Sequence, residues 1–296
     1  MHRQRESNHV QLLKQLFWSS RPISWINTAF PFAVSYLFVG RTMDVRFWVG
    51  TLFFLIPYNL LMYGVNDVFD YESDLRNPRK GGIEGALLDP KWHLPTIKWA
   101  FGLCVPFIGF LLLTGDYLPN LLLGLFVFTV IAYSAKGFRY KEKPFLDSIT
   151  SASHFVGPMI YGIALAGGNL LNPQTMLLIA GFTLWGVASH AFGAVQDVKA
   201  DREADIHSIA TAIGARATTR FAFACDALSG VLVSVSGWPS ALAAIAAIPY
   251  LAIIWPHWDV TDETCESANA GWKKFIWLNF FAGAVVSMIT IWAAFF

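Results

Sequence analysis

Two groups of carboxylates, each at the end of an apolar stretch, are the residues here whose types and spacing suit chemistry. Within each group the acids recur every three or four positions, which puts them on one face of a helix. The groups are Asn66, Asp67, Asp70 and Asp74, and then Asp197, Asp201 and Asp205. Such carboxylates repel one another, so a cation must compensate for them. Because Mg²⁺ often bridges carboxylates to substrate phosphates, two facing groups would enclose a diphosphate.

Basic and aromatic side chains accompany both groups. Lys and Arg beside a carboxylate-bound Mg²⁺ suit a diphosphate leaving group, and aromatic faces stabilise a carbocation. The candidates for contact with the substrate are Arg79, Lys80, Tyr133, Lys136, Arg139 and Lys199. A diphosphate next to an apolar bundle indicates an allylic prenyl diphosphate, whose C–O bond ionises because the resulting cation is delocalised. Asp67, Asp70, Asp197 and Asp201 are the expected catalytic acids.

Simpler explanations exist for each feature taken alone. One acidic group is most often a solvated helix face, but two groups that each leave a membrane span are harder to explain in this way. Two deeper polar residues, Asn59 and His190, precede Asn66 and Asp197 by seven positions and share their helical faces. Each of the two either positions an acceptor, quenches a cation, or is a buried polar group that a neighbouring helix satisfies.

The elements that carry these residues are expected to span a membrane. The chain is 55% hydrophobic and only 14% charged, whereas about a quarter of residues are charged in soluble domains. Residues 148–196 and 227–258 contain no Asp, Glu, Lys or Arg. A spanning helix needs about 20 mostly apolar residues, so the chain is expected to be all-α and polytopic. The nine predicted helices, in one domain over residues 1–296, are 22–40, 47–66, 95–114, 118–134, 148–166, 174–195, 218–236, 239–255 and 273–295.

The distribution of Lys and Arg predicts the orientation. With the N-terminus in the cytoplasm, the outer loops contain only Arg41 and Arg46, and nearly all other basic residues lie inside. Both acidic groups then lie on the cytoplasmic face of the cell membrane, because an even number of helices separates them. Residues 1–21 are expected to form an amphipathic helix on that surface. No basic block with interleaved aromatic residues suggests a nucleic-acid partner.

These motifs resemble those of the UbiA superfamily of intramembrane prenyltransferases, over nearly the whole chain. The N-D-x-x-D-x-x-x-D motif of that superfamily matches residues 66–74, and its D-x-x-x-D motif, with a third Asp, matches 197–205. Tyr133 to Lys136 is similar to a Tyr-and-Lys loop of the family. The resemblance implies nine helices around a cavity, Mg²⁺ as cofactor held through both motifs, and diphosphate contacts from loop bases. The sequence after the first motif differs from the Arg-Pro that many relatives have there, since it reads Asn77-Pro78-Arg79-Lys80.

Within the superfamily, residues 67–90 look most like the actinobacterial lycopene elongases. That resemblance implies dimethylallyl diphosphate as the donor, lycopene as the acceptor, and membrane proteins of the carotenoid pathway as partners beside the lipids. The alternatives that stay open are prenylation of an aromatic quinone precursor such as 4-hydroxybenzoate or a naphthoate, a divalent-cation transporter, since intramembrane carboxylates also line ion paths, and a non-catalytic scaffold.

Overall fold

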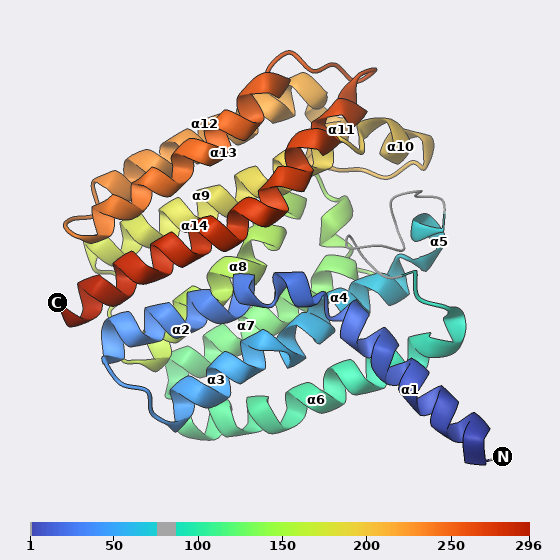
Figure 1. Ribbon diagram of the computed structural model, residues 1–296, viewed down its shortest axis with the longest axis horizontal. Coiled ribbons are helices and arrows are strands. Elements are labelled where there is room, and N and C mark those ends of the chain that lie inside the picture. The colour runs from blue at the N-terminus through green and yellow to red at the C-terminus, as the bar shows by residue number, and fades with distance from the viewer. Residues whose placement is uncertain (1, 76–86) are drawn as a thin grey trace.

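The computed structural model describes residues 2–75 and 87–296, which form helices and loops without a strand. The long helices lie side by side in one bundle (Figure 1). In chain order the α-helices are α1 (His2–Ser19), α2 (Ile26–Gly40), α3 (Val45–Leu55), α4 (Pro57–Phe69), α5 (Tyr71–Asp74), α6 (His93–Thr114), α7 (Tyr117–Ser134), α8 (Leu146–Leu165), α9 (Pro173–Val195), α10 (Val198–Glu203), α11 (Ile209–Ile213), α12 (Ala215–Ser234), α13 (Ala247–Ile254) and α14 (Asn269–Phe295).

The nine predicted ranges coincide with helical segments of the described chain, to within a few residues at each end. Three of them are interrupted: a bend precedes α2, the second range divides into α3 and α4, and a 3₁₀ segment, Ser240–Ala246, precedes α13. Six of the described segments are long and apolar enough to cross a membrane, or seven if α1 and α2 count as one bent span. The all-helical membrane architecture is therefore confirmed.

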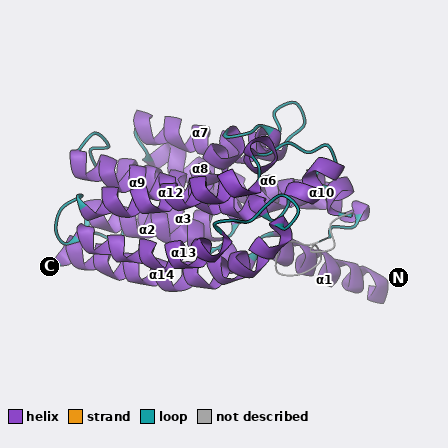
Figure 2. Cartoon of the chain, turned by 90° about the horizontal axis from the view of Figure 1, so that it is seen from above, coloured by secondary structure: helices purple, strands orange, loops and turns teal. Residues whose placement is uncertain are grey.

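The bundle has two hydrophobic cores. One is formed chiefly by α2, α3, α4, α6, α7 and α8, around Phe32, Phe54 and Tyr58. The other is formed by α9, α12, α13 and α14, around Phe192, Tyr250 and Phe275, together with Ala152 of α8. Seen from above, the helices form stacked rows (Figure 2). Because each half has its own core, the space between the halves is where cavities can persist.

The α2–α8 crossing depends on a glycine. A Cβ atom added to Gly162 would lie 2.4 Å from Ser35 Oγ and 2.7 Å from the carbonyl oxygen of Phe32. The hydroxyl of Ser35 also donates across the crossing to the carbonyl of Met159, at 3.0 Å. The two backbones therefore approach each other closely, as small residues permit between membrane helices.

The second predicted helix is broken because Pro57 has no N–H to continue the hydrogen-bond ladder of α3. Asn59 lies at this break and is fully buried. Its Nδ2 donates to Thr28 Oγ1 at 2.7 Å and to the carbonyls of Phe54 and Leu55 at 2.8 and 3.1 Å. The expectation that Asn59 faces the substrate cavity therefore finds no support: its amide satisfies carbonyls that the break exposes.

Both acidic groups lie at the same end of the bundle, where Figure 1 shows α5 and α10. The N-terminal helix α1 extends from this end, and the chain ends at the opposite one.

Candidate active site

A polar cavity of about 1220 Å³ lies at the end of the bundle that carries α5 and α10. Both acidic groups contribute to its lining. The predicted site residues that it brings together are Asn66, Asp70, Tyr133, Lys136, Arg139, His190, Asp197, Asp201 and Asp205. Residues more than 120 positions apart in the sequence thus face one space, as the spacing of the two motifs predicted.

The first wall of the cavity is the end of α4. Asp70 follows the last turn of this helix, and its N–H bonds back to the carbonyl of Asn66. The Asn66 Nδ2 donates to Asp70 Oδ2 at 2.7 Å and to Ser134 Oγ of α7 at 2.9 Å. Asn66 therefore orients the Asp70 carboxylate and ties it to the helix that carries Tyr133.

The second wall is α10 and the loop after it. Asp197 is the N-cap residue of α10, two positions after the end of α9, Asp201 lies one turn further on, and Asp205 has a left-handed φ of 54°. Arg202 Nη1 donates to Asp262 Oδ2 at 2.6 Å, which anchors α10 to the loop before α14. The main-chain N–H of Ala215 and this guanidinium hold the pKa of Asp262 below its ordinary value.

The loop between α7 and α8 brings positive charge to the first wall. Lys141 Nζ donates to Asp70 Oδ1, and Arg139 Nη2 lies 4.0 Å from the same oxygen. Arg139 also donates to Glu142, and that hydrogen bond lowers the pKa of the Glu142 carboxyl. The sequence analysis did not single out Lys141, because the preference of Lys and Arg for the cytoplasmic side already accounts for it. The available signal was its position two residues after Arg139.

Asp67 is placed differently from Asp70. Its side chain is fully buried, and Arg21 Nη2 donates to its Oδ1 at 3.0 Å. The same guanidinium lies 4.4 Å from the centre of the Tyr63 ring, and both Arg21 and Tyr63 line the cavity. Asp67 thus holds a cavity base in place, and it is not itself among the described lining residues. Arg21 was the second site residue that the sequence did not reveal.

The remaining candidates lie elsewhere or outside what is described. Lys199 is exposed on α10 and, like Asn59, is absent from the described lining of the cavity. Arg79 and Lys80 lie outside the described residues, as does the side chain of Asp74.

The donor set suits a hard divalent cation that a substrate completes. Among the described residues no three His, Cys, Asp or Glu side chains already form a group close enough to hold a metal. Mg²⁺ usually retains water and binds one or two carboxylates together with substrate phosphates. Carboxylates on two walls of one cavity, with Lys141 and Arg139 beside them, fit that mode of binding.

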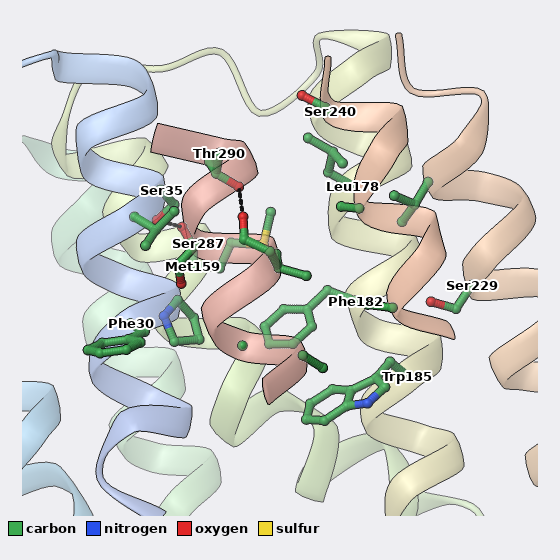
Figure 3. A pocket seen from close by; sticks show the side chains of 18 of the residues that line it. Phe30, Ser35, Met159, Leu178, Phe182, Trp185, Ser229, Ser240, Ser287 and Thr290 are labelled. Carbon is green, nitrogen blue, oxygen red and sulfur yellow. Dashed lines mark hydrogen bonds between the residues drawn. The ribbon is translucent and has the colours of Figure 1, made fainter. Parts of the chain in front are cut away.

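A second, apolar cavity adjoins the polar one. Asn27, Trp185 and Asn279 line both. Its walls come from α2, α8, α9, α12, α13 and α14, and side chains such as Phe30, Leu178 and Phe182 surround it (Figure 3). No Lys or Arg is among its described lining residues. Phe30 and Val286 are partly exposed on the flank of the bundle, so the cavity reaches the surface that lipid would cover.

The sequence and the fold both match known proteins. The chain matches the UbiA prenyltransferase family over residues 28–280. It is 54% identical over 283 residues to the C(50) beta-cyclic carotenoids biosynthesis protein LbtBC of Dietzia sp., covering 95% of this chain and 65% of that protein. It is 48% identical to the lycopene elongase/hydratase of Corynebacterium glutamicum over 95% of this chain and 98% of that one.

Solved structures resemble the fold at low sequence identity. A UbiA homologue from Archaeoglobus fulgidus bound to DMAPP and Mg²⁺ superposes with a TM-score of 0.66 at 18% identity, covering 92% of this chain and 99% of that one. A digeranylgeranylglyceryl phosphate synthase superposes with a TM-score of 0.69 at 15% identity, covering 96% and 99%. At these identities the likeness shows the fold alone.

Proposed function

The chain belongs to the UbiA prenyltransferase family, and from that premise we propose that it transfers a dimethylallyl group from its diphosphate to lycopene, with Mg²⁺. The relatives of about 50% identity support a role in carotenoid biosynthesis. The Dietzia protein is half as long again as this chain, which spans 65% of it, so its activity is carried over only as a proposal.

One observation carries the proposal: the polar cavity with both acidic groups adjoins the apolar cavity through Asn27, Trp185 and Asn279. A prenyl diphosphate has one strongly charged end and one hydrocarbon end. Its diphosphate would lie between the two walls of carboxylates, and its allylic carbon would point toward Trp185. The acceptor would then approach through the apolar cavity and meet that carbon at the junction.

The described residues of the polar cavity fall into two groups, those that would bind the metal and those that would contact the diphosphate. Asn66, Asp70, Asp197, Asp201 and Asp205 would hold Mg²⁺, which supplies positive charge for the departing diphosphate. Lys141, Arg139 and Lys136 add charge-assisted hydrogen bonds to its oxygens. Such preorganised charge is commonly the largest contribution to catalysis.

The allylic cation needs stabilisation that does not trap it. Tyr63, Tyr133 and Trp185 line the polar cavity, and their ring faces attract a cation without offering a strong nucleophile. Because the apolar walls exclude water from the other side, the cation would survive long enough for an alkene to attack it.

The lining of the apolar cavity favours a hydrocarbon acceptor over an aromatic acid. A carboxylate acceptor would need a cation beside it, and the described lining offers none. Lycopene requires only apolar contact along its length. Prenylation of 4-hydroxybenzoate or a naphthoate is the alternative outcome of the test below.

We also propose that the aspartate-rich end faces the cytoplasm of the cell membrane. The basic loops cluster at that end, which is the side that Lys and Arg prefer. The prenyl diphosphate would therefore reach the polar cavity directly from the water-soluble pool.

The test is a product-mass assay on the protein in lipid, with dimethylallyl diphosphate and lycopene, and with and without EDTA. We expect products of 45 and 50 carbons that EDTA abolishes and added Mg²⁺ restores. Product with hydroxybenzoate or a naphthoate, and none with lycopene, would reject the acceptor but keep the reaction type. Cation flux into proteoliposomes without diphosphate release from any donor would favour a transporter.

A further inference from the structure

His190 of α9 has a hydrogen-bond partner on each ring nitrogen. Ser148 Oγ of α8 lies 3.0 Å from its Nδ1, and the Tyr133 hydroxyl of α7 lies 3.2 Å from its Nε2. Both Tyr133 and His190 line the polar cavity, whereas Ser148 is buried behind them. The Nε2 atom is therefore the one on the side of the cavity.

Asp147 determines how these hydrogen bonds are directed. It is fully buried, and it accepts the N–H of Ser148 and the N–H of Ile209, each at 2.7 Å. It also accepts the Ser148 hydroxyl, at 3.3 Å. With its one proton given to Asp147, the Ser148 oxygen can only accept from His190 Nδ1–H. The neutral imidazole then carries its lone pair on Nε2, where it accepts the Tyr133 hydroxyl.

This arrangement is that of a general base. Nε2 is held as an acceptor toward the cavity because a buried chain of hydrogen bonds fixes the tautomer from behind, as carboxylates commonly do for imidazoles. Prenylation of an alkene needs such a base, since the attack leaves a carbocation on the acceptor. A mere structural role for His190 would be served equally by either tautomer.

We propose that His190 Nε2, through the Tyr133 hydroxyl, takes the proton that ends the reaction, an inference that rests on the proposed prenyl transfer. The allylic C–O bond breaks and its electron pair leaves with the diphosphate, while the π pair of the acceptor forms the new C–C bond. The tertiary cation then loses a proton from a neighbouring carbon to the Tyr133 oxygen, which passes its own proton to Nε2. The C–H pair becomes the new double bond.

The same pair of residues serves when water ends the reaction. The water oxygen then forms the C–O bond to the cation, and its proton follows the same route through Tyr133 to Nε2. The departing diphosphate, in the same cavity, takes the proton from the imidazolium and resets the site. Ser148 and Asp147 are positioning residues in either case, because they act only through the imidazole.

The decisive variants are H190Q and Y133F, with H154Q as the matched control. His154 is a second buried histidine, and its ring lies 5.1 Å from that of Tyr133, but it is absent from the described lining of the cavity. Y133F keeps the ring that faces the cation and removes only the hydroxyl. S148A removes the group that fixes the tautomer.

We expect H190Q and Y133F to lower kcat at least about 100-fold, the lower end of the effect of a general base. S148A should lower kcat by about tenfold at unchanged KM, and H154Q should stay within about threefold. Binding of a non-ionisable thio analogue of dimethylallyl diphosphate, together with the melting temperature, shows that each variant is folded and keeps its donor site.

The outcomes distinguish the proposed role of His190 from the proposed prenyl transfer. Every variant is assayed with whichever acceptor the wild type prenylates, since an aromatic acceptor must also lose a proton. H190Q with near wild-type kcat and an unchanged ratio of alkene to alcohol products would overturn the role of His190 and leave the prenyl transfer intact. A wild type that transfers to no acceptor would overturn both.

Discussion

Asp67 and Asp70 are three residues apart at the end of α4 and make contacts of different kinds. Asp67 is enclosed and paired with Arg21, whereas Asp70 lies at the cavity, with Asn66 on one oxygen and Lys141 on the other. The Lys141 ammonium places a positive charge beside the Asp70 carboxylate. Two aspartates of one motif therefore differ in position: Asp67 is buried against Arg21, and Asp70 faces the cavity, where we propose that it binds the metal.

Replacing one carboxylate on either wall of the polar cavity should abolish most activity. We expect Asp70→Asn and Asp201→Asn each to lower kcat/KM at least about 100-fold, because each removes charge that would hold Mg²⁺ against the diphosphate. The measurement is product formation at saturating Mg²⁺. Asp259→Asn, an exposed acid paired with Arg220 away from the cavity, is the control and should retain activity. Activity within tenfold of wild type in either cavity variant would contradict the assignment.

The sequence predicted the acidic residues that line the cavity better than the basic residues that contact them. The acids of both motifs are recognisable by their spacing, and eight of the nine predicted residues in the cavity come from the motifs or from the Tyr133 to Arg139 loop. Arg21 and Lys141 were not singled out, because the preference of Lys and Arg for the cytoplasmic side already accounts for a base in such a segment. Asn59 shares a helical face with Asn66 in an ideal helix, but the carbonyls exposed at the Pro57 break determine its contacts.

At the scale of elements, the shape of the two cavities depends on contacts that fix the spacing between helices. Ser35 of α2 and Met159 of α8 are hydrogen-bonded across the crossing of these two helices, and both line the apolar cavity. The loop before α14 holds α10 through Asp262, which accepts from Arg202 and from the first residue of α12. Small changes at either contact should therefore alter the cavities without removing a carboxylate that lines them.

The close α2–α8 approach predicts a sharp difference between two glycines. Gly162→Ala places a methyl group against the main chain of α2 and should destabilise the protein by about 1–3 kcal/mol. Gly124→Ala on α7, where a Cβ meets nothing within 4 Å, should be neutral or stabilise by up to about 1 kcal/mol. Thermal unfolding in detergent compares them. Equal melting temperatures for the two variants would show that the crossing tolerates a side chain.

The pKa of Asp262 predicts how the anchor of α10 depends on pH. Because folding lowers this pKa, the stabilisation is complete above the unfolded value of 3.8 and is lost as the pH falls through the folded value. Asp262→Asn should therefore lower the melting temperature equally at pH 7 and pH 5.5, and the deficit should shrink only below about pH 4. A deficit that already shrinks between pH 7 and pH 5.5 would assign it to another group.

At the scale of the whole molecule, charge-free stretches predicted where the long helices lie but not their interruptions. Within the charge-free run 148–196, for example, the structure has the two long helices α8 and α9, and α9 is long and apolar enough to cross a membrane. The break at Pro57 has a local cause that a count of apolar residues overlooks, whereas the 3₁₀ segment before α13 packs against α12 and α14, contacts that no local pattern records. The two cavities likewise arise between two cores that fold from separate halves of the chain.

The orientation can be tested with single cysteines. The native Cys104, Cys225 and Cys265 are all buried, so the background should be low. A membrane-impermeant maleimide should label Leu171→Cys, in the exposed loop between α8 and α9, in intact cells. Lys199→Cys on α10 should react only after the cells are permeabilised, because the basic end faces inward. The reverse labelling pattern would invert the proposed topology.

The three residues shared by the two cavities have a consequence for kinetics. If the donor arrives from water and the acceptor from the bilayer, the two never share a solvent before they meet at Trp185. The rate should then follow the mole fraction of acceptor among the lipids rather than its amount per volume of suspension. Adding empty vesicles that do not fuse should leave the turnover unchanged, whereas diluting the acceptor with lipid inside the same vesicle should slow it.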